Sequence, residues 1–310
     1  MASLENIQSQ HFKLKEIGHG IFAAIHQSGG AAIANAGIID LGNATLIFDT
    51  FISPAAAKDL RHAAEALTGH PVTYVFNSHY HNDHIRGNQE FPDAQIISTT
   101  ETLQLIRTAG VEELSWDQDN APKRYLHFQN IYENAQDQSD RESIRFILDY
   151  YRVLAESLEG LNMIEPQHTF QDSLSLSGSS RTVELLTYGG GHTGDDGFLF
   201  IPDAGVLFLA DLLFVGCHPY LADGDPDNLI LILKKLSQLD ANLLVPGHGP
   251  LGTKKDLALM MDYVQVVSDL AKQHADDEII TPPPPFDTWE LDMFFQSNLD
   301  FLSRWQSTIH

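Results

Sequence analysis

Short apolar runs alternate along the chain with longer segments whose apolar residues recur at helical spacing. The apolar runs have the length of buried β-strands and cover residues 21–26, 36–41, 45–48, 72–76, 95–98, 182–187, 197–201, 206–209 and 242–245. The helical pattern covers residues 54–67, 100–109, 226–236 and 253–264. Three of these helices follow a residue type that caps helix N-termini, namely Ser53, Asp225 and Thr253. The alternation predicts an α/β protein.

Two further segments depart from this alternation. Residues 115–165 are polar and aromatic at first, and apolar positions then recur at helical intervals from Ile144 to Leu154, which predicts a helical insertion. A proline run at 282–285 precedes an amphipathic stretch, which predicts a C-terminal helix within residues 286–310. The proline run could mark a domain boundary, but the helix after it is apolar enough to need a surface to pack on. We therefore expect one domain over residues 1–310.

The charge of the chain excludes one class of partner. The 310 residues carry a formal net charge of −24, and no cluster of Lys or Arg stands out, so we expect no nucleic-acid partner. No apolar run approaches the ~18 residues that a membrane span needs, and the first residues lack the pattern of a secretion signal. We therefore expect a cytoplasmic protein that acts on a small molecule and does not bind membranes.

A cluster of metal-binding side chains follows the strand predicted at 72–76. His79, His81, Asp83 and His84 lie within six positions. Side chains two positions apart in an extended chain point the same way, so His79 and His81 can reach one metal. Asp83 and His84 follow as the chain turns and can face a second metal. Three more candidates stand near the ends of later strands: His192, Asp211 and His248. Imidazole and carboxylate donors suit zinc, with iron or manganese as alternatives, and we expect two divalent ions.

The order of these motifs resembles that of the metallo-β-lactamase-fold superfamily of metallohydrolases. The shared marks span residues 21–252 and are His-x-His-x-Asp-His from His79, Gly-His-Thr around His192, Asp211 after an apolar strand, Pro-Gly-His-Gly around His248, and Asp49 after an apolar run. The resemblance implies a four-layer αβ/βα sandwich with the metals at one edge.

The resemblance also implies a role for each ligand. One metal would be bound by His79, His81 and His192. The other would be bound by Asp83, His84 and His248, and Asp211 would bridge the two. Asp49 would orient the ligands, and the alternative is that it only satisfies nearby backbone amides.

The reaction that the resemblance implies is hydrolysis by a hydroxide that bridges the two metals. It would attack an ester, thioester, lactone or amide bond of a small molecule, and Asp83 would orient the hydroxide or pass a proton to the leaving group. Class B1 and B2 β-lactamases carry Cys where this chain has Asp211. Phe214 stands where class B1 enzymes carry a basic residue and acyl-homoserine lactonases a Tyr.

The chain therefore resembles the broad group of β-lactamase-like and glyoxalase II-like zinc hydrolases, whose substrates are heterogeneous. A β-lactamase-like or phosphodiesterase activity is an alternative. A protein that retains the metals but only binds or scaffolds is another.

Six further side chains are candidates for a substrate pocket. Tyr80, His218 and Tyr220 stand near ligand motifs in the sequence, and Tyr132, Tyr150 and Tyr151 lie in the 115–165 insertion. The insertion is either a lid that lines the pocket or a packing or homodimer surface.

Overall fold

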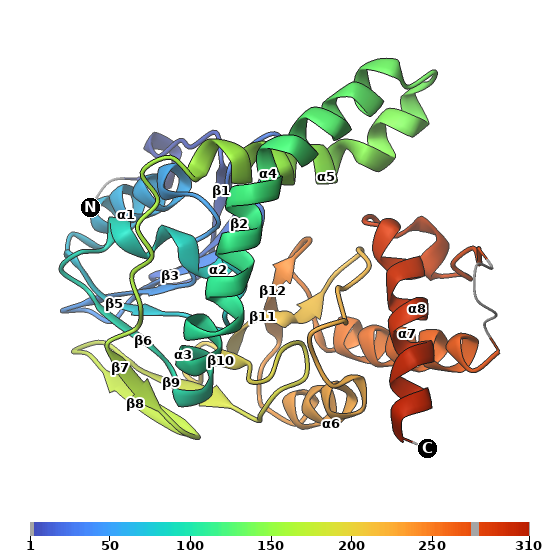
Figure 1. The fold of residues 1–310 in the computed structure, drawn as a ribbon. Coiled ribbons are helices and arrows are strands. Elements are labelled where there is room, and N and C mark those ends of the chain that lie inside the picture. The colour runs from blue at the N-terminus through green and yellow to red at the C-terminus, as the bar shows by residue number, and fades with distance from the viewer. Residues whose placement is uncertain (1–2, 274–278, 310) are drawn as a thin grey trace.

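The computed structural model describes residues 3–273 and 279–309, in which two β-sheets pack face to face between helices (Figure 1). Within these residues the first sheet has the order β1-β2-β3-β4-β5-β6-β7 and the second the order β12-β11-β10-β9-β8. The strands of the first sheet are β1 (Phe12–Gly18), β2 (Ile21–His26), β3 (Ala36–Asp40), β4 (Thr45–Phe48), β5 (Val72–Phe76), β6 (Gln95–Thr99) and β7 (His168–Phe170). Those of the second are β8 (Ser173–Ser177), β9 (Thr182–Thr187), β10 (Gly197–Ile201), β11 (Val206–Phe214) and β12 (Leu243–His248).

The pairing changes direction inside each sheet. Strands β1 to β4 form an antiparallel meander, and β4 to β7 then run parallel. In the second sheet β8 to β11 are antiparallel, and β12 pairs parallel to β11. Parallel neighbours bring the carboxyl ends of β4, β5, β11 and β12 to one edge, where loops can meet.

Helices cover the outer faces of both sheets. The helices are α1 (Pro54–Thr68), α2 (Asn82–Ile85), α3 (Thr100–Arg107), α4 (Ala109–Asn134), α5 (Gln138–Ser157), α6 (Pro226–Ser237), α7 (Lys254–Ala271) and α8 (Met293–Ile309). Short 3-10 turns are η1 (Leu4–Asn6), η2 (Arg86–Glu90) and η3 (Phe286–Thr288).

Three buried clusters separate the layers. Leu60 of α1 packs on the outer face of the first sheet, and Phe48 meets Phe208 between the two sheets. Leu244 of the second sheet packs with residues of α6 and α7, among them Met260. The prediction of an α/β fold with four αβ/βα layers is therefore confirmed.

Local sequence explains where the main helices begin. The side chain of Ser53 accepts a hydrogen bond from the amide of Ala56, and Pro54 fills the first helical position of α1. Asp225 caps α6 in the same way, and Thr253 opens α7 with a capping box. The three caps predicted from the sequence are confirmed.

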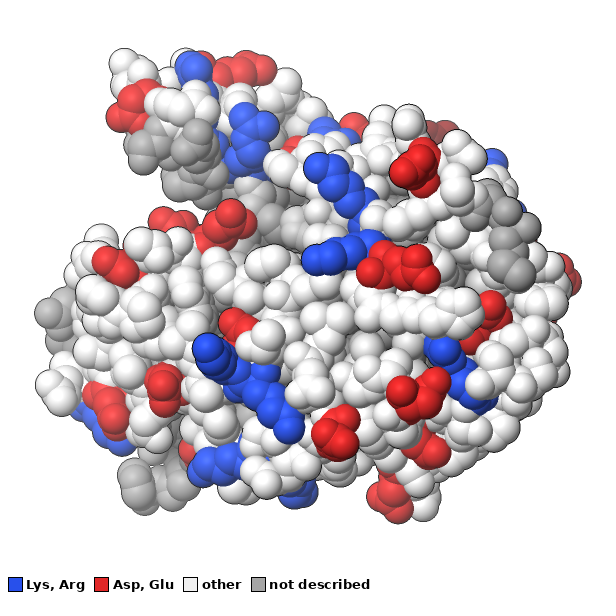
Figure 2. All heavy atoms as spheres, turned by 180° about the vertical axis from the view of Figure 1, so that it is seen from behind, with Lys and Arg blue, Asp and Glu red and all other residues white. Residues whose placement is uncertain are grey.

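The insertion is more helical than the sequence indicated. Helices α4 and α5 form a hairpin that projects from the body of the molecule (Figure 1). Seen from behind, the hairpin overhangs a hollow with acidic side chains along its edge (Figure 2). At its base, Val153 and Leu154 pack against Ile33 and Ile52.

The C-terminal helix packs against the body. Phe295, Leu299 and Leu302 of α8 are buried in the cluster that contains Tyr263 of α7. The segment after the proline run thus packs on α7, as its apolar pattern suggested. Every helix within residues 3–273 and 279–309 falls short of the length and hydropathy that crossing a membrane requires.

Candidate metal centre

The edge at which the parallel strands end gathers all seven predicted ligands. The loop after β5 carries His79 and His81, and the short helix α2 follows with Asp83 and His84. From the second sheet come His192 in the loop between β9 and β10, Asp211 within β11, and His248 at the end of β12. The ligands thus come from both sheets, and the site depends on the sandwich being closed.

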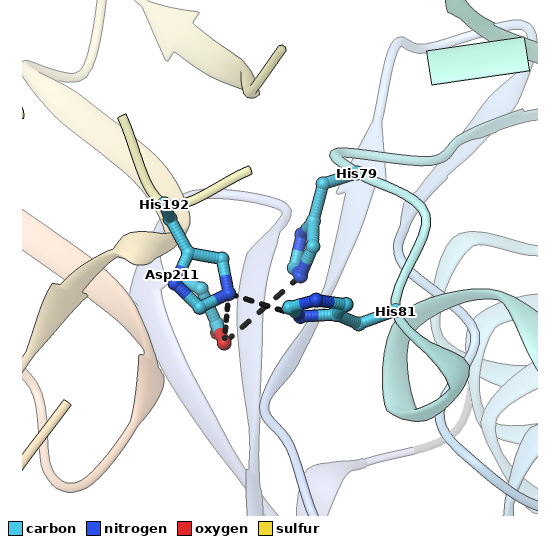
Figure 3. A group of neighbouring side chains, drawn as sticks. All are labelled: His79, His81, His192 and Asp211. Atoms are coloured by element: carbon cyan, nitrogen blue, oxygen red, sulfur yellow. Dashed lines mark hydrogen bonds and ion pairs between the residues drawn. The ribbon is translucent and has the colours of Figure 1, made fainter. Parts of the chain in front are cut away.

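The ligands form two groups. In the first, one ligand atom from each of His79, His81, His192 and Asp211 lies within 4.8 Å of the others, and Figure 3 shows these side chains pointing toward one another. The second group is Asp83, His84 and His248, whose ligand atoms are equally close. The two groups are those that the resemblance to the superfamily implied.

Asp211 lies between the groups and faces both. Its Oδ2 is 3.2 Å from Nε2 of His192 and 4.0 Å from Nε2 of His79. Its Oδ1 is 3.1 Å from Nε2 of His84 and 3.5 Å from Nε2 of His248. Each oxygen of one carboxylate therefore serves a different group, which is the geometry that a bridging ligand needs.

Buried polar atoms test whether metals fit these residues. Within the described residues, Nε2 of His79, Nε2 of His84 and Oδ1 of Asp211 are buried and have no well-formed hydrogen bond, and their close ion-pair contacts are to other predicted ligands. Burying polar atoms in this way is costly, so groups of this kind call for an explanation. All three point into the space between the ligands, and imidazole and carboxylate donors suit a divalent ion. The residues fit two metals.

The electrostatics of the site agree with this fit. Burial lowers the pKa of His84, but the carboxylates of Asp211, Asp83 and Asp49 outweigh it and raise that pKa well above its usual range. Burial raises the pKa of Asp83, but His84 and His248 outweigh it and lower the pKa to about 2. The buried carboxylates thus favour positive charge beside them, which divalent ions supply.

Asp49 contacts the ligands and the backbone together. Its Oδ2 lies 2.7 Å from Nδ1 of His84, and its Oδ1 accepts a hydrogen bond from the amide of Ser78. The hydroxyl of Ser78 bonds to Oδ2 of Asp49 and lies 2.9 Å from Nδ1 of His79. Both contacts weighed for Asp49 from the sequence are present. The residue has a φ of 58°, a strained backbone conformation that is common at functional sites.

Two acidic residues that the sequence did not single out hold other ligands. Oδ2 of Asp223 lies 3.0 Å from Nε2 of His81 and accepts a hydrogen bond from the hydroxyl of Tyr80. Asp196 accepts from the amides of Gly191, His192 and Thr193 and so fixes the loop that carries His192. The spacing of Asp196 after His192 is a local turn pattern that sequence reasoning could have used. Asp223 is far from His81 in sequence and gave no such signal.

Gly247 makes room for the carboxylate of Asp211. A Cβ at this position would lie 1.9 Å from Oδ1 of Asp211 and 2.8 Å from the carbonyl carbon of Ala210. Any side chain would collide with the carboxylate of Asp211, because real Cβ atoms do not approach other atoms so closely. The glycine before His248 is therefore required by close approach.

The insertion braces the turn that carries four ligands. The side-chain amide of Asn82 donates to the hydroxyl of Tyr150 on α5 at 2.9 Å. Arg86, which is 1% exposed, donates to Oδ2 of Asp117 on α4 at 2.5 Å. Since Asn82 stands between His81 and Asp83, the hairpin contacts the ligand turn directly.

A cavity of about 310 Å³ opens over the two groups of predicted ligands. The ligands that line it are His81, Asp83, His192, Asp211 and His248. Its other walls include Tyr150, Tyr151 and Tyr220, which the sequence had indicated as pocket residues, and Phe146, Glu113 and Phe294, which it had not. The volume suits a small molecule.

Three other residues that we expected in the pocket lie elsewhere in the structure. His218 is fully buried, with Nδ1 3.0 Å from the hydroxyl of Tyr263 and an aromatic cluster around it. Tyr132 lies farther along the hairpin, where its hydroxyl accepts from Arg145. Tyr80 is 8% exposed and does not line the cavity, but it supports Asp223. Nearness to a ligand in sequence placed Tyr220 in the cavity but not Tyr80 or His218, because adjacent residues on a strand or turn face different ways.

Comparisons with known proteins agree with this geometry. A family model described as the metallo-beta-lactamase superfamily matches residues 29–248. A metallo-beta-lactamase from Pontibacter korlensis has a similar structure, with a TM-score of 0.59 and 17% identity over 82% of this chain and 99% of that one. The metallo-beta-lactamase FIM-1 from Pseudomonas aeruginosa, in its mono-zinc form, gives a TM-score of 0.60 and 13% identity over 83% and 96% of the chains. The comparison with curated proteins found no match.

Proposed function

This chain belongs to the metallo-beta-lactamase superfamily, and we propose that it is a hydrolase of small-molecule ester, thioester, lactone or amide bonds that binds two divalent metal ions, most readily zinc. The observation that carries the proposal is the position of Asp211, with one oxygen toward each group of ligands. A single-metal site would leave one of these groups, and its buried nitrogens, without a function.

The ligand set divides between the metals as the distances suggest. His79, His81 and His192 would hold one ion, and Asp83, His84 and His248 the other, with Asp211 shared by both. Two such ions supply an activated water and polarise the bond to be cleaved.

The residues of the chain orient the reacting groups. Asp83 lines the cavity and stays ionised at neutral pH, because its pKa is about 2. We therefore assign its carboxylate to accepting a hydrogen bond from the attacking water and orienting it, rather than to storing a proton. Asp49 acts as a positioning residue through His84 and Ser78.

We also propose that the insertion shapes the substrate site as part of a single functional domain. Tyr150 and Tyr151 of α5 line the cavity, which supports a lid over the pocket rather than a purely structural insertion. The bond between Asn82 and Tyr150 ties that lid to the ligand turn.

The test combines metal content with turnover. The purified protein should carry close to two divalent ions per chain by elemental analysis, and it should hydrolyse at least one compound in a panel of esters, thioesters, lactones and amides. Asp211→Asn should lose metal and at least about 100-fold in activity. Asp240→Asn, which changes an exposed aspartate outside the site, is the matched control.

Two results would contradict the proposal. Protein that holds no metal and takes up none from added zinc would exclude the metalloenzyme. Protein with two metals that turns over nothing in the panel would favour a metal-retaining binding protein instead.

A further inference from the structure

The lining of the cavity is acidic and aromatic. Besides ligands, it includes the carboxylates of Glu113 and Asp223, and no Lys or Arg is among its described lining residues. Phe214 stands at the position where the sequence comparison with class B1 β-lactamases expects a basic residue, and it too lines the cavity. A substrate carboxylate would find no cationic side chain there.

The two carboxylates differ in how well they are satisfied. Asp223 has partners on both oxygens, from His81, Tyr80 and Tyr220. Within the described residues Glu113 forms no hydrogen bond, and its nearest cation is Arg86, with Nη2 at 3.9 Å from Oε2.

Arg86 is shared between Glu113 and Asp117, and its closer contact is to Asp117. The guanidinium of Arg86 binds Asp117 at 2.5 Å, so one cation serves two carboxylates. Burial raises the pKa of Glu113 to about 8, with Arg86 opposing the shift and Asp117 adding to it, so the residues around Glu113 stabilise its ionised form poorly. A cation on the cavity side would stabilise that ionised form.

Aromatic rings stand around the same space. Tyr150 meets Tyr151 edge-on at 5.3 Å between ring centroids and stacks on Phe146 at 6.5 Å, all three on α5. On another wall, Tyr220 meets Phe294 at 5.7 Å. The faces of such rings attract cations, most strongly where water is excluded.

The groove that adjoins the cavity carries the same charge. It lies between the loop after β2, helix α5 and residues 287–292, and it shares Ile33, Phe146 and Leu291 with the cavity. Its charged lining residues are Asp149, Asp287, Glu290, Asp292 and one cation, Arg145. A groove with this excess of negative charge favours the entry of cations over anions.

We propose that the substrate carries an amine or quaternary ammonium group that lies against Glu113 and the rings of α5, while its scissile bond faces the metal ligands. This inference rests on the proposed hydrolase for the reaction, but the cationic subsite stands on the lining of the cavity alone. Carboxylate-bearing substrates, for which the described lining residues supply no Lys or Arg, would be poor ones.

A binding measurement tests the subsite without turnover. Benzyltrimethylammonium is titrated calorimetrically into the zinc-loaded protein, and 2-phenylethanesulfonate, a weak metal ligand of similar size, serves as the anionic probe. We expect the cation to bind at least about tenfold more tightly than the sulfonate. Glu113→Gln should weaken cation binding by about tenfold or more, and Glu113→Asp should restore most of it.

Glu112→Gln is the matched control. Glu112 is the exposed neighbour of Glu113 on α4, so this substitution removes the same charge outside the cavity. Its affinity for the cation should stay within about twofold of the unsubstituted protein. Zinc content and thermal unfolding, measured on each variant, show whether the fold and the metals are retained. Equal affinity in Glu113→Gln and the unsubstituted protein, or tighter binding of the sulfonate, would overturn the proposal.

Kinetics separate this proposal from the hydrolase itself. Three esters with the same leaving group and acyl chains that end in methyl, trimethylammonium or carboxylate should follow the order cation, neutral, anion in kcat/KM. Turnover of all three without preference for the cation would overturn the subsite and leave the hydrolase. Binding of the cation through Glu113 without turnover of any ester would support the subsite and count against the hydrolase.

Discussion

Replacing Gly247 with alanine should dislodge the carboxylate that both metal groups share. The added Cβ would lie 1.9 Å from Oδ1 of Asp211 and 2.8 Å from the carbonyl carbon of Ala210. Oδ1 is the oxygen that faces His84 and His248. The substitution therefore acts on the bridge without changing any ligand.

The size of the effect follows from the geometry. Asp211 has to move by roughly 1.5 Å to reach ordinary contact, whereas metal–ligand distances tolerate only about 0.2 Å. The same Cβ would also lie too close to the backbone of Ala210 in β11, so a rotation of the carboxylate alone does not relieve the collision. A displacement of about 1 Å in a reacting site costs on the order of 100-fold in rate. We expect a loss of that order, together with the loss of about one metal per chain.

Metal content after dialysis against a weak chelator is the primary assay, because it needs no known substrate. Gly110→Ala is the matched control, since the nearest atom to its Cβ is at 3.6 Å and no strained backbone angle is involved. Retention of both metals in Gly247→Ala would show that Asp211 is not held as described, and the bridging role would have to be abandoned.

Three further predictions concern side chains around the site. Asp117→Asn should lower the free energy of unfolding by about 3 kcal/mol in urea, because fully buried Arg86 loses its closest carboxylate; a loss below about 1 kcal/mol would contradict a strong buried pair. Asp49→Asn should weaken metal binding by about 10–100-fold in chelator competition, and unchanged affinity would limit Asp49 to supporting the backbone. Burial lowers the pKa of His218 from 6.5 to about 4, so between these values the unfolded chain binds a proton that the folded protein excludes, and stability falls as the pH drops. At pH 5 this costs about 2 kcal/mol relative to pH 7, and His218→Asn should lack that part of the pH dependence; an identical slope in both proteins would refute the assignment.

The sequence predicted the elements whose burial is one-sided or complete. Strands such as β5 and β10 are continuous apolar runs, and their predicted bounds match the structure. The prediction stopped β11 at residue 209, because Asp211 interrupts the apolar pattern. The strand continues to Phe214, although its pairing with β12 is irregular between Ala210 and Phe214. Polar ligands inside a strand hide its true length.

The elements that the sequence missed have weak or misleading patterns. Strand β1 alternates apolar residues with lysine, and β8 alternates leucine with serine, so neither forms an apolar run. Helix α4 contains Pro122 and exposes Val111 and Leu126, and its apolar residues therefore do not mark one face. Such a helix depends on packing against α5, which periodicity along one segment cannot show.

Site residues were predictable where several ligands share a short motif. The close spacing of His79 and His84 indicates a metal site, and the order of the later motifs along the chain predicts the remaining ligands. Asp223 and Glu113 carry no motif, because their roles come from folding: Asp223 meets His81 across 142 positions. Long-range contacts of single acidic residues can be identified only in the folded structure.

The hairpin links two properties that an engineer would wish to vary separately. Tyr150 is both a wall of the cavity and a partner of Asn82, so remodelling this wall also perturbs the turn that holds His81 and Asp83. Replacing the hairpin with that of a relative would therefore change substrate selectivity and weaken metal binding together, unless Tyr150 and Asp117 are kept. Phe146 offers a more independent handle, since it faces the cavity and has its aromatic contact within α5. During evolution the same coupling would restrict changes in substrate preference to positions such as Phe146, because substitutions at Tyr150 would weaken metal binding first.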